Sequence, residues 1–275
     1  MSLRARPLPQ IVLTVALLAL SMTVIVPLYL LVINSLKTPA EANKLELSLP
    51  TQLEWGNYAK VFEAANLSLA FQNSFILTFA SVAIIIVAGA AAAFVLQRRR
   101  DKYTGFLNLL VMMGLVVPPA IVPLYQLLNF FDLNGTITGV VLINVAVRSP
   151  LSIFLCYQFL KSISREIDEA AIIDGCGNYK LFFRIVFPLM SPILVTVIIF
   201  NAIYVWNDFI YVLYFLSSGT KITLPLTLYL FTGQFSTQWN LVFADIVIIS
   251  APLLLIYFAL QRYIIAGLTA GATKG

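Results

Sequence analysis

The sequence predicts an all-α polytopic membrane protein with six transmembrane helices and both termini in the cytoplasm. Three observations lead to this prediction: the composition, six long apolar stretches, and the distribution of the basic residues. Hydrophobic residues make up 60% of the 275 residues and charged residues only 11%, and the mean hydropathy is +0.94. A water-soluble domain carries roughly 25% charged residues, so this chain cannot cover a globule of its size with polar surface.

Each of the six apolar stretches is long enough to cross a bilayer, whose hydrocarbon core of about 30 Å requires ~20 helical residues. The strands of a β-barrel would instead show about ten residues of alternating hydropathy, whereas these stretches are continuously apolar. The predicted spans are residues 11–33, 75–96, 106–128, 139–160, 189–213 and 241–260.

The first stretch follows Arg4 and Arg6, so a cleaved signal peptide is an alternative to a membrane span. Its apolar run exceeds the 7–15 residues that are typical of a signal peptide, and no clear small-residue cleavage site follows it. We therefore expect a retained first span.

The basic residues set the orientation of the spans. Of the 17 Lys and Arg residues, twelve fall on the loops that are inside when the N-terminus is inside, four fall outside, and Arg148 lies within a span. Cytoplasmic loops carry an excess of Lys and Arg, so both termini are expected in the cytoplasm. Cys156 and Cys176 lie towards that side, where disulfides are rare, and are expected to be reduced.

Prolines in the third, fifth and sixth predicted spans are candidate breaks. Pro118, Pro119 and Pro123 break the third span, and Pro192 and Pro252 fall in the fifth and sixth. Such breaks are tolerated where neighbouring helices satisfy the freed carbonyls. They serve either as hinges for a rocking motion or as static kinks.

Three connections are long enough to carry function. Residues 34–74 and 214–240 are predicted outside, and residues 161–188 inside. The outer loops carry Trp and Tyr beside Asn, Gln and Thr, which suits a wet protein interface and equally suits an interfacial aromatic belt.

The inner loop, residues 161–188, predicts two short amphipathic helices. Ser164 is a plausible N-cap before the acidic first turn of the first helix, and Gly175 marks its C-terminal end. In this helix Ile163, Ile167, Ala170 and Asp174 share a face at helical spacing. In the second helix, from Asn178 to Pro188, the residues that share a face are Tyr179, Phe182, Phe183 and Val186. The pair forms either a docking surface or an amphipathic loop that rests on lipid.

The same loop resembles the EAA loop of ABC importer permeases. That pattern is E-A-A-x3-G-x9-I-x-L-P, and this sequence departs from it only at Phe187, where leucine is usual. The resemblance assigns contact with an ATPase subunit to the matching positions, which are Glu169, Ala170, Ala171, Gly175, Ile185 and Pro188.

Two further segments resemble the carbohydrate-uptake permeases within that family. Trp206-Asn207-Asp208-Phe209 is similar to their W-N-[DE]-F motif. Residues 261–275 contain GLTAG and end in Lys-Gly, as does the maltose-type second permease subunit. Without the resemblance, this tail would be read as a frayed terminus.

The resemblance implies a type I ABC importer permease fold. Residues 1–70 would hold the cytoplasmic N-terminus, the first span and the outer loop. Residues 71–262 would form the ABC transmembrane type-1 core with coupling loop 161–188, and residues 263–275 the cytoplasmic C-terminal tail. The implied location is the cytoplasmic membrane of a bacterium or archaeon.

The resemblance also implies several partners: a second permease in a heterodimer, two ABC ATPase subunits, an extracytoplasmic sugar-binding protein and the lipid. The chain has no Gly-Lys dipeptide and hence no phosphate-binding loop of the G-x-x-x-x-G-K type. We therefore expect no enzymatic activity, no bound cofactor or metal and no nucleic acid in this chain. ATP and Mg²⁺ would be used by the partner subunits.

Three ionisable residues lie within the predicted spans, where charged groups are costly. Arg148 is expected to pair with Asp208 or Asp245; the alternatives are an ion pair that only holds the conformation, or shallow residues in outer-leaflet water. The spans also carry hydrogen-bonding and aromatic side chains that suit a sugar pathway, namely Asn144, Asn201, Tyr204, Trp206, Asn207 and Asp208.

The predicted function is therefore that of a transmembrane permease subunit of an ABC sugar importer. A permease for a non-sugar solute is an alternative. An ion-coupled secondary transporter would show inverted repeats with carboxylates near the midplane, and neither is evident. A membrane-embedded enzyme is disfavoured because histidine is absent and paired acids are scarce.

Overall fold

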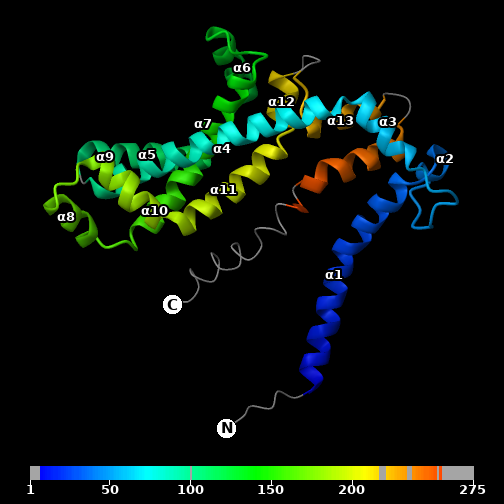
Figure 1. The fold of residues 1–275 in the computed structure, drawn as a ribbon, viewed down its shortest axis with the longest axis horizontal. Helices are drawn as coiled ribbons and strands as arrows, with labels where there is room; N and C mark the ends of the chain where they lie inside the picture. The colour runs from blue at the N-terminus through cyan, green and yellow to red at the C-terminus, as the bar shows by residue number, and fades with distance from the viewer. Residues whose placement is uncertain (1–6, 100, 217–220, 234–236, 253, 256–275) are drawn as a thin grey trace. The chain divides into compact units, whose positions relative to one another are not determined.

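A computed structural model describes residues 7–99, 101–216, 221–233, 237–252 and 254–255, and within these it is built from helices (Figure 1). The main helices are α1 (Pro7–Ser35), α2 (Pro39–Ala42), α3 (Gly56–Ala64), α4 (Leu67–Arg98), α5 (Lys102–Val116), α6 (Ile121–Phe130), α7 (Ile137–Leu160), α8 (Glu166–Ile173), α9 (Asn178–Lys180), α10 (Phe187–Leu189), α11 (Ser191–Trp206), α12 (Ile210–Phe215) and α13 (Leu224–Phe231). A π-helical turn (Leu181–Val186) joins α9 to α10, and a further helix runs over Trp239–Pro252.

Within the described ranges, three helices are long and apolar enough to cross a membrane: α1, α4 and α7. A fourth span is possible if the bent pair Asn178–Leu189 and Ser191–Trp206, which meet at 77°, counts as one. The predicted third span is two shorter helices, because Pro118 and Pro119 interrupt it between α5 and α6. The predicted sixth span, residues 241–260, lies partly outside the described residues, so six spans remain a prediction.

The chain divides into two compact units, which are described separately. The larger comprises residues 69–226 and 253–275. In it α7 packs against α5, α11 and α12, and α4 contributes Ile85, Ala90 and Ala93 to a core that also holds Cys156 and Leu160 of α7.

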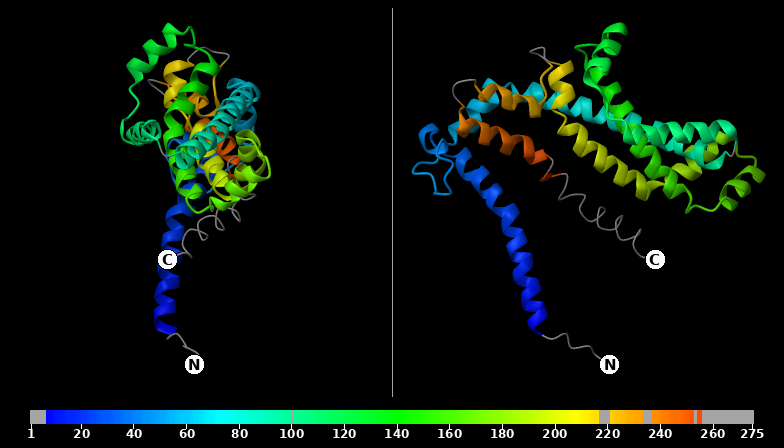
Figure 2. Two further views of the ribbon diagram at one scale, coloured as in Figure 1. Left: turned by 90° about the vertical axis from the view of Figure 1, so that its left-hand side faces the viewer. Right: turned by 180° about the vertical axis from the view of Figure 1, so that it is seen from behind.

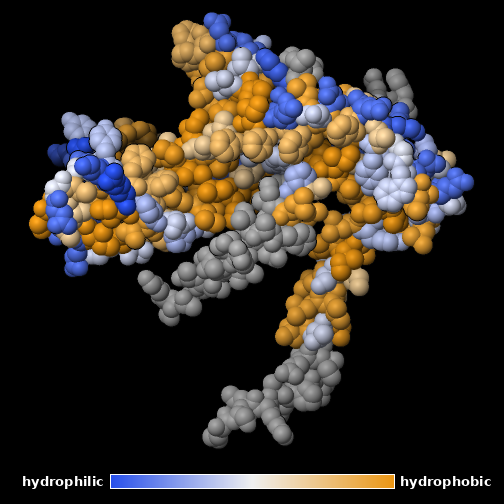
Figure 3. Space-filling view, in the orientation of Figure 1, coloured by the Kyte–Doolittle hydropathy of each residue, from blue (hydrophilic) through white to orange (hydrophobic). Residues whose placement is uncertain are grey.

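Close approach of α5 to α7 depends on a glycine. A Cβ atom at Gly114 would lie 2.8 Å from Cγ of Pro150 on α7, which is closer than van der Waals contact permits. The two views of Figure 2 show α6 projecting away from the other helices of this unit. Much of the remaining surface is apolar (Figure 3), and Phe130 of α6 is 79% exposed.

The smaller unit comprises residues 1–68 and 227–252. Residues 12–29 of α1 are exposed throughout. After α1 the chain turns at α2, where Thr38 accepts a hydrogen bond from the Glu41 amide and the Glu41 carboxylate accepts one from Thr38. This reciprocal capping box satisfies amides that the helix itself leaves free.

A buried hydrogen-bond network fixes the segment that follows, residues 36–66. Asn57 Nδ2 donates to the carbonyls of Ser35 (2.9 Å) and Lys37 (3.0 Å), and its Oδ1 accepts from Asn240 Nδ2 (2.9 Å). Lys37 is 1% exposed, and its Nζ donates to the carbonyl of Glu46 (2.6 Å). The network ties this segment to the end of α1 and to the start of the helix Trp239–Pro252.

Candidate functional site

The helix that carries the E-A-A sequence, α8, begins and ends where local chemistry dictates. Its first turn holds the acidic residues Glu166, Asp168 and Glu169, which interact favourably with the positive end of the helix dipole. Ser164 Oγ accepts a hydrogen bond from the Glu166 amide at 3.3 Å. At its end Gly175 adopts φ +79°. The Gly175 amide donates to the carbonyl of Ile172, and the Cys176 amide donates to that of Ala171. This pattern is a Schellman motif. The predicted helix and its glycine stop are therefore confirmed, whereas the residue at the N-cap position is Arg165 and not Ser164.

The face that helical spacing groups together on α8 is not the face that the helix buries. The residues of α8 that are buried are Asp168 and Ala171, whereas Ile167 and Ala170 of the predicted face are exposed. Exposed beside them are Glu169, Ile172 (55%) and Ile173 (84%). The helix therefore turns an acidic group and bulky apolar side chains outward.

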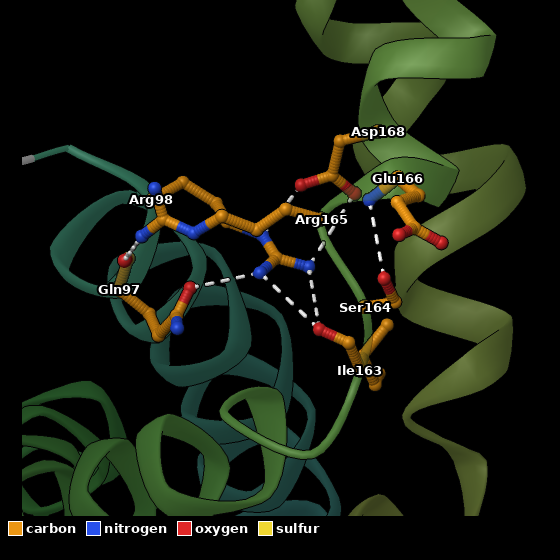
Figure 4. Close-up of polar contacts among 7 residues, drawn as sticks. All are labelled: Gln97, Arg98, Ile163, Ser164, Arg165, Glu166 and Asp168. Atoms are coloured by element: carbon orange, nitrogen blue, oxygen red, sulfur yellow. Dashed lines mark hydrogen bonds and ion pairs between the residues drawn. The ribbon is translucent and has the colours of Figure 1, made fainter.

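The buried Asp168 forms an ion pair with Arg98, at the end of α4 (Figure 4). Arg98 Nε lies 2.5 Å from Asp168 Oδ2, and Arg98 Nη2 donates to Oδ1 at 3.4 Å. The two side chains are only 11% and 10% exposed. Burial raises the pKa of the Asp168 carboxyl, and the positive charge of Arg98 opposes that rise.

Three further contacts join the end of α4 to the stretch before α8 (Figure 4). Arg98 Nη1 and Nη2 each lie 3.5 Å from the carbonyl oxygen of Ile163, and Arg165 Nη2 donates to the carbonyl of Gln97 at 2.9 Å. A fork-shaped guanidinium that bonds both a carboxylate and a carbonyl fixes orientation as well as distance. Arg98 and Arg165 thus each link α4 to the inner loop.

A groove of 400 Å³ borders this junction. It combines arginine side chains, the acidic edge of α8 and apolar residues from α4 and the loop, a mixture that suits a protein partner better than lipid tails. It is lined by Phe94, Val95, Arg98, Arg99, Arg165, Asp168, Glu169, Ile172, Asn178 and Leu181.

The second half of the inner loop packs into the core through aromatic rings. Phe182 is buried and lies 5.4 Å, between ring centroids, from Phe94 of α4. Tyr179 and Phe183, which share its predicted face, are 85% and 51% exposed. Residues Leu181–Val186 form a π-helical turn, which has more residues per turn than an α-helix. Side chains at α-helical spacing therefore point in different directions, and the predicted face does not form.

The helical run Asn178–Leu189 ends one residue beyond Pro188 and bends by 77° to the next helix, Ser191–Trp206. The predicted end at Pro188 is therefore confirmed to within one residue. The side chain of Pro188 is exposed, as is Gly175, and Ile185 is half-buried.

The Trp206–Phe209 segment forms the break between α11 and α12. Asp208 Oδ1 accepts the amide of Tyr211 (3.1 Å) in the first turn of α12, and Oδ2 accepts from Asn144 Nδ2 (3.0 Å) of α7. Trp206 is buried and lies edge-on to Phe71 of α4, 5.8 Å between centroids. These side chains hold the break in place.

Few of the predicted pathway residues are accessible. Asn201 is buried and donates to Ser152 Oγ of α7 at 3.0 Å, and Asn144 is fully buried. Tyr204 and Asn207 are exposed. The buried members of the set therefore link α7 to α11, and only the exposed pair is open to a solute.

The predicted ion pair of Arg148 does not form among the described residues. The Arg148 guanidinium lies over the ring of Tyr204, and the carboxylate of Asp208 is already engaged by Asn144 and the Tyr211 amide. Asp245, in the smaller unit, accepts a hydrogen bond from Thr227 Oγ1 at 2.8 Å. A cation over an aromatic face is an alternative partner to a carboxylate.

The sequence pattern does not single out Arg98, Arg165 and Asp168 as site residues. The run of arginines after the second apolar stretch indicates the orientation of the spans, and a basic cluster beside an acidic loop also signals a contact. The GLTAG segment and the rest of the tail, residues 261–275, lie outside the described residues.

The chain is similar to known transport proteins. Residues 85–269 match the family described as "binding-protein-dependent transport system inner membrane component". The chain is 34% identical over 91% of each chain to the melibiose/raffinose/stachyose import permease protein MelC of Bacillus subtilis. It is 30% identical, over the full length of both chains, to the arabinooligosaccharides transport system permease protein AraQ of Halalkalibacterium halodurans.

The fold is also found in a solved structure. A chain in the crystal structure of a bacterial ABC transporter involved in the import of the acidic polysaccharide alginate aligns with a TM-score of 0.82. The alignment covers 96% of this chain and 99% of that chain at 20% sequence identity.

Proposed function

Because the chain belongs to the family of binding-protein-dependent transport system inner membrane components, we propose that it is a transmembrane permease subunit of an ABC importer for sugars. Relatives of at least 30% identity over nearly the whole chain carry names of oligosaccharide permeases. The observation that carries the coupling role is the outward edge of α8, which presents Glu169 and Ala170 above a glycine-stopped helix end.

The inner loop is the docking surface for an ABC ATPase subunit. Glu169 lies in a groove that also holds arginines, so its charge is available to a basic group of a partner. The exposed Ile172 and Ile173 supply apolar area that water would otherwise cover. Anchoring by Arg98 keeps this surface in one orientation relative to α4.

The full assembly contains a second permease, two ATPase subunits and an extracytoplasmic sugar-binding protein. The exposed apolar side chains of α1 and α5 are consistent with burial against lipid or the second permease. Six spans with both termini in the cytoplasm, as the distribution of Lys and Arg favours, place the inner loop on the ATPase side and residues 34–74 on the outer side. The chain resides in the cytoplasmic membrane.

Within the sugar pathway, Tyr204 and Asn207 are the residues that meet the solute. The face of the Tyr204 ring that Arg148 leaves free can cover the C–H face of a sugar. Asn207 Nδ2 donates to the Ile203 carbonyl, and its side-chain oxygen and second N–H can bond a sugar hydroxyl. The buried Asn144, Asn201, Trp206 and Asp208 shape the pathway by holding α11 and α12 against α7 and α4.

The docking role is tested by purifying the complex in detergent and scoring the ATPase subunits that accompany the chain. We expect Glu169→Lys and Gly175→Asp to lose them. Glu166→Gln, an exposed position on the same helix, is the matched control and should retain them. Association with none of the forms, wild type included, would refute the docking role, and uptake driven by an ion gradient would then favour a secondary carrier.

A further inference from the structure

We propose that Arg98 and Asp168 form a positioning pair that ties α8 to the end of α4, so that displacement of α8 by a docked ATPase is passed to α4. This inference rests on the docking role of α8 proposed above. It goes further because it names the residues that carry the motion into the membrane-spanning part.

The attachment of α8 depends unusually strongly on polar contacts. Of its eight residues only Asp168 and Ala171 are buried, and an alanine methyl contributes little apolar area. Ala171 packs in the core and α8 contacts the π-helical turn, but the ties to α4 are polar: the ion pair, the bonds of Arg98 to the Ile163 carbonyl and the bond of Arg165 to the Gln97 carbonyl (Figure 4). Of these ties, the ion pair is the one that reaches a residue within α8 itself.

The pair is better suited to fixing geometry than to adding stability. Taking two charges out of water costs about as much as their attraction returns, so evolution toward stability alone would favour apolar side chains here. The guanidinium instead holds a carboxylate and a backbone carbonyl at once, and such a forked contact resists both rotation and sliding.

Helix α4 is built to pass such a displacement on. It has 32 residues, about 48 Å at roughly 1.5 Å per residue. Its end at Arg98 holds α8. Near its start Phe71 packs on Trp206 (5.8 Å), Asn73 donates to the Ile222 carbonyl (2.9 Å), and Ser74 Oγ accepts the Leu224 amide (2.9 Å). One helix therefore connects the docking surface to the break that Trp206 and Asp208 hold.

The first test compares transport with ATP hydrolysis in the complex reconstituted with its ATPase subunits and binding protein. In Asp168→Asn and Arg98→Gln we expect the ATPase subunits to stay bound and ATP to be hydrolysed. Sugar uptake per ATP should fall about ten-fold, within the range of coupling energies between sites. Arg98→Lys, which keeps the charge but not the fork, should recover part of the uptake.

Lys102→Gln is the control. Lys102 is an exposed cation close in the chain to Arg98 and does not line the groove, so uptake per ATP should stay at the wild-type value. Unchanged uptake per ATP in Asp168→Asn would overturn the proposal, as would loss of uptake in proportion to loss of bound ATPase. A wild-type chain that binds no ATPase would overturn the docking role itself, which separates the two failures.

A second measurement does not depend on the stability of the variants. Spin labels at Arg99→Cys and Glu166→Cys, both exposed positions, report the separation of α4 and α8 once the free Cys156 and Cys176 are replaced by Ala. We expect the same distance with and without ATP, because the two helices move together, and a nucleotide-dependent distance once Asp168→Asn is added. A distance that changes with ATP while Asp168 is intact would overturn the proposal.

Discussion

Residues 161–188 and residues 36–66 both connect apolar helices, and they keep their shapes with different chemistry. In the first half of the inner loop the long-range polar ties are made by charged side chains, with Arg98 and Asp168 at their centre. In the 36–66 segment they are an amide and an ammonium group that donate to backbone carbonyls, with Asn57 and Lys37 at the centre.

The difference indicates how each region is used. A side chain that donates to two carbonyls fixes the path of the chain itself, which gives a rigid surface. An ion pair between two helices leaves each helix intact and links them as bodies, which permits them to move as a unit. We infer that the 36–66 segment is a preformed platform and that the inner loop is a moving part.

Among the variants that test this difference between the two regions, Asn57→Asp should have the largest effect on stability. The change replaces a buried donor by a charged oxygen that faces the carbonyls of Ser35 and Lys37. An uncompensated buried charge costs about 3–5 kcal/mol, so we expect a large drop in thermal stability in detergent. The same change at Asn66, which is exposed, should alter stability by no more than about 0.5 kcal/mol. Equal effects at the two sites would mean that the Asn57 network does not hold the platform.

Lys37→Met should have the next largest effect. It removes the donor to the Glu46 carbonyl while keeping most of the apolar volume of the side chain. Leaving a buried acceptor unsatisfied costs about 1–3 kcal/mol, and hydrogen exchange should rise in residues 36–66 but not in α8. Lys44→Met, at an exposed position, is the control. Faster exchange in α8 as well would contradict the separation of the two regions.

Gly175→Ala tests the turn of the inner loop. No atom lies within 4 Å of the added Cβ, so the cost comes from φ +79° alone, about 1–2 kcal/mol for an L-residue in the left-handed region. Gly177 also has open space, but its φ is −74°, so Gly177→Ala should be tolerated. ATPase association should therefore weaken in the first variant and persist in the second. Equal loss in both would indicate that the partner needs the space and not the backbone turn.

The smallest expected effect is a pH dependence of the platform at Glu41. Hydrogen bonds, first of all from the Thr51 hydroxyl, lower the pKa of Glu41 from 4.5 to about 2. A lowered folded-state pKa stabilises above the unfolded value, so the contribution is complete above about pH 4.5 and is lost as the pH falls through about 2. Protease protection of residues 38–51 should follow this course and become pH-independent in Glu41→Gln. Loss of protection well above pH 4.5 would assign the effect to another group.

The sequence predicts best what short-range chemistry decides. The acidic first turn of α8 and the Gly175 stop are local features, and both are present. The long apolar runs also gave helices, although the double proline Pro118-Pro119 divided one predicted span and the π-helical turn moved the face of another helix.

The buried face of α8 shows why the rest could not be predicted. Helical periodicity selected Ile163, Ile167 and Ala170 because they are apolar, yet the helix buries Asp168. The reason is Arg98, 70 residues earlier in the chain, and no periodic pattern encodes a partner at that distance. The same holds for Asp208, whose bond to Asn144 of α7 replaces the expected pairing with Arg148.

The exposed surface of α1 indicates that its sequence can change with little effect on the rest of the chain. Residues 12–29 are all exposed, so the described part of this chain constrains them mainly by hydropathy and little by shape. Exchanges among Leu, Val, Ile and Ala in these residues should therefore have little effect on the rest of the described chain. The family match begins only at residue 85. The helix is therefore the natural place to exchange one apolar segment for another, as in a chimaera that carries a different leading helix.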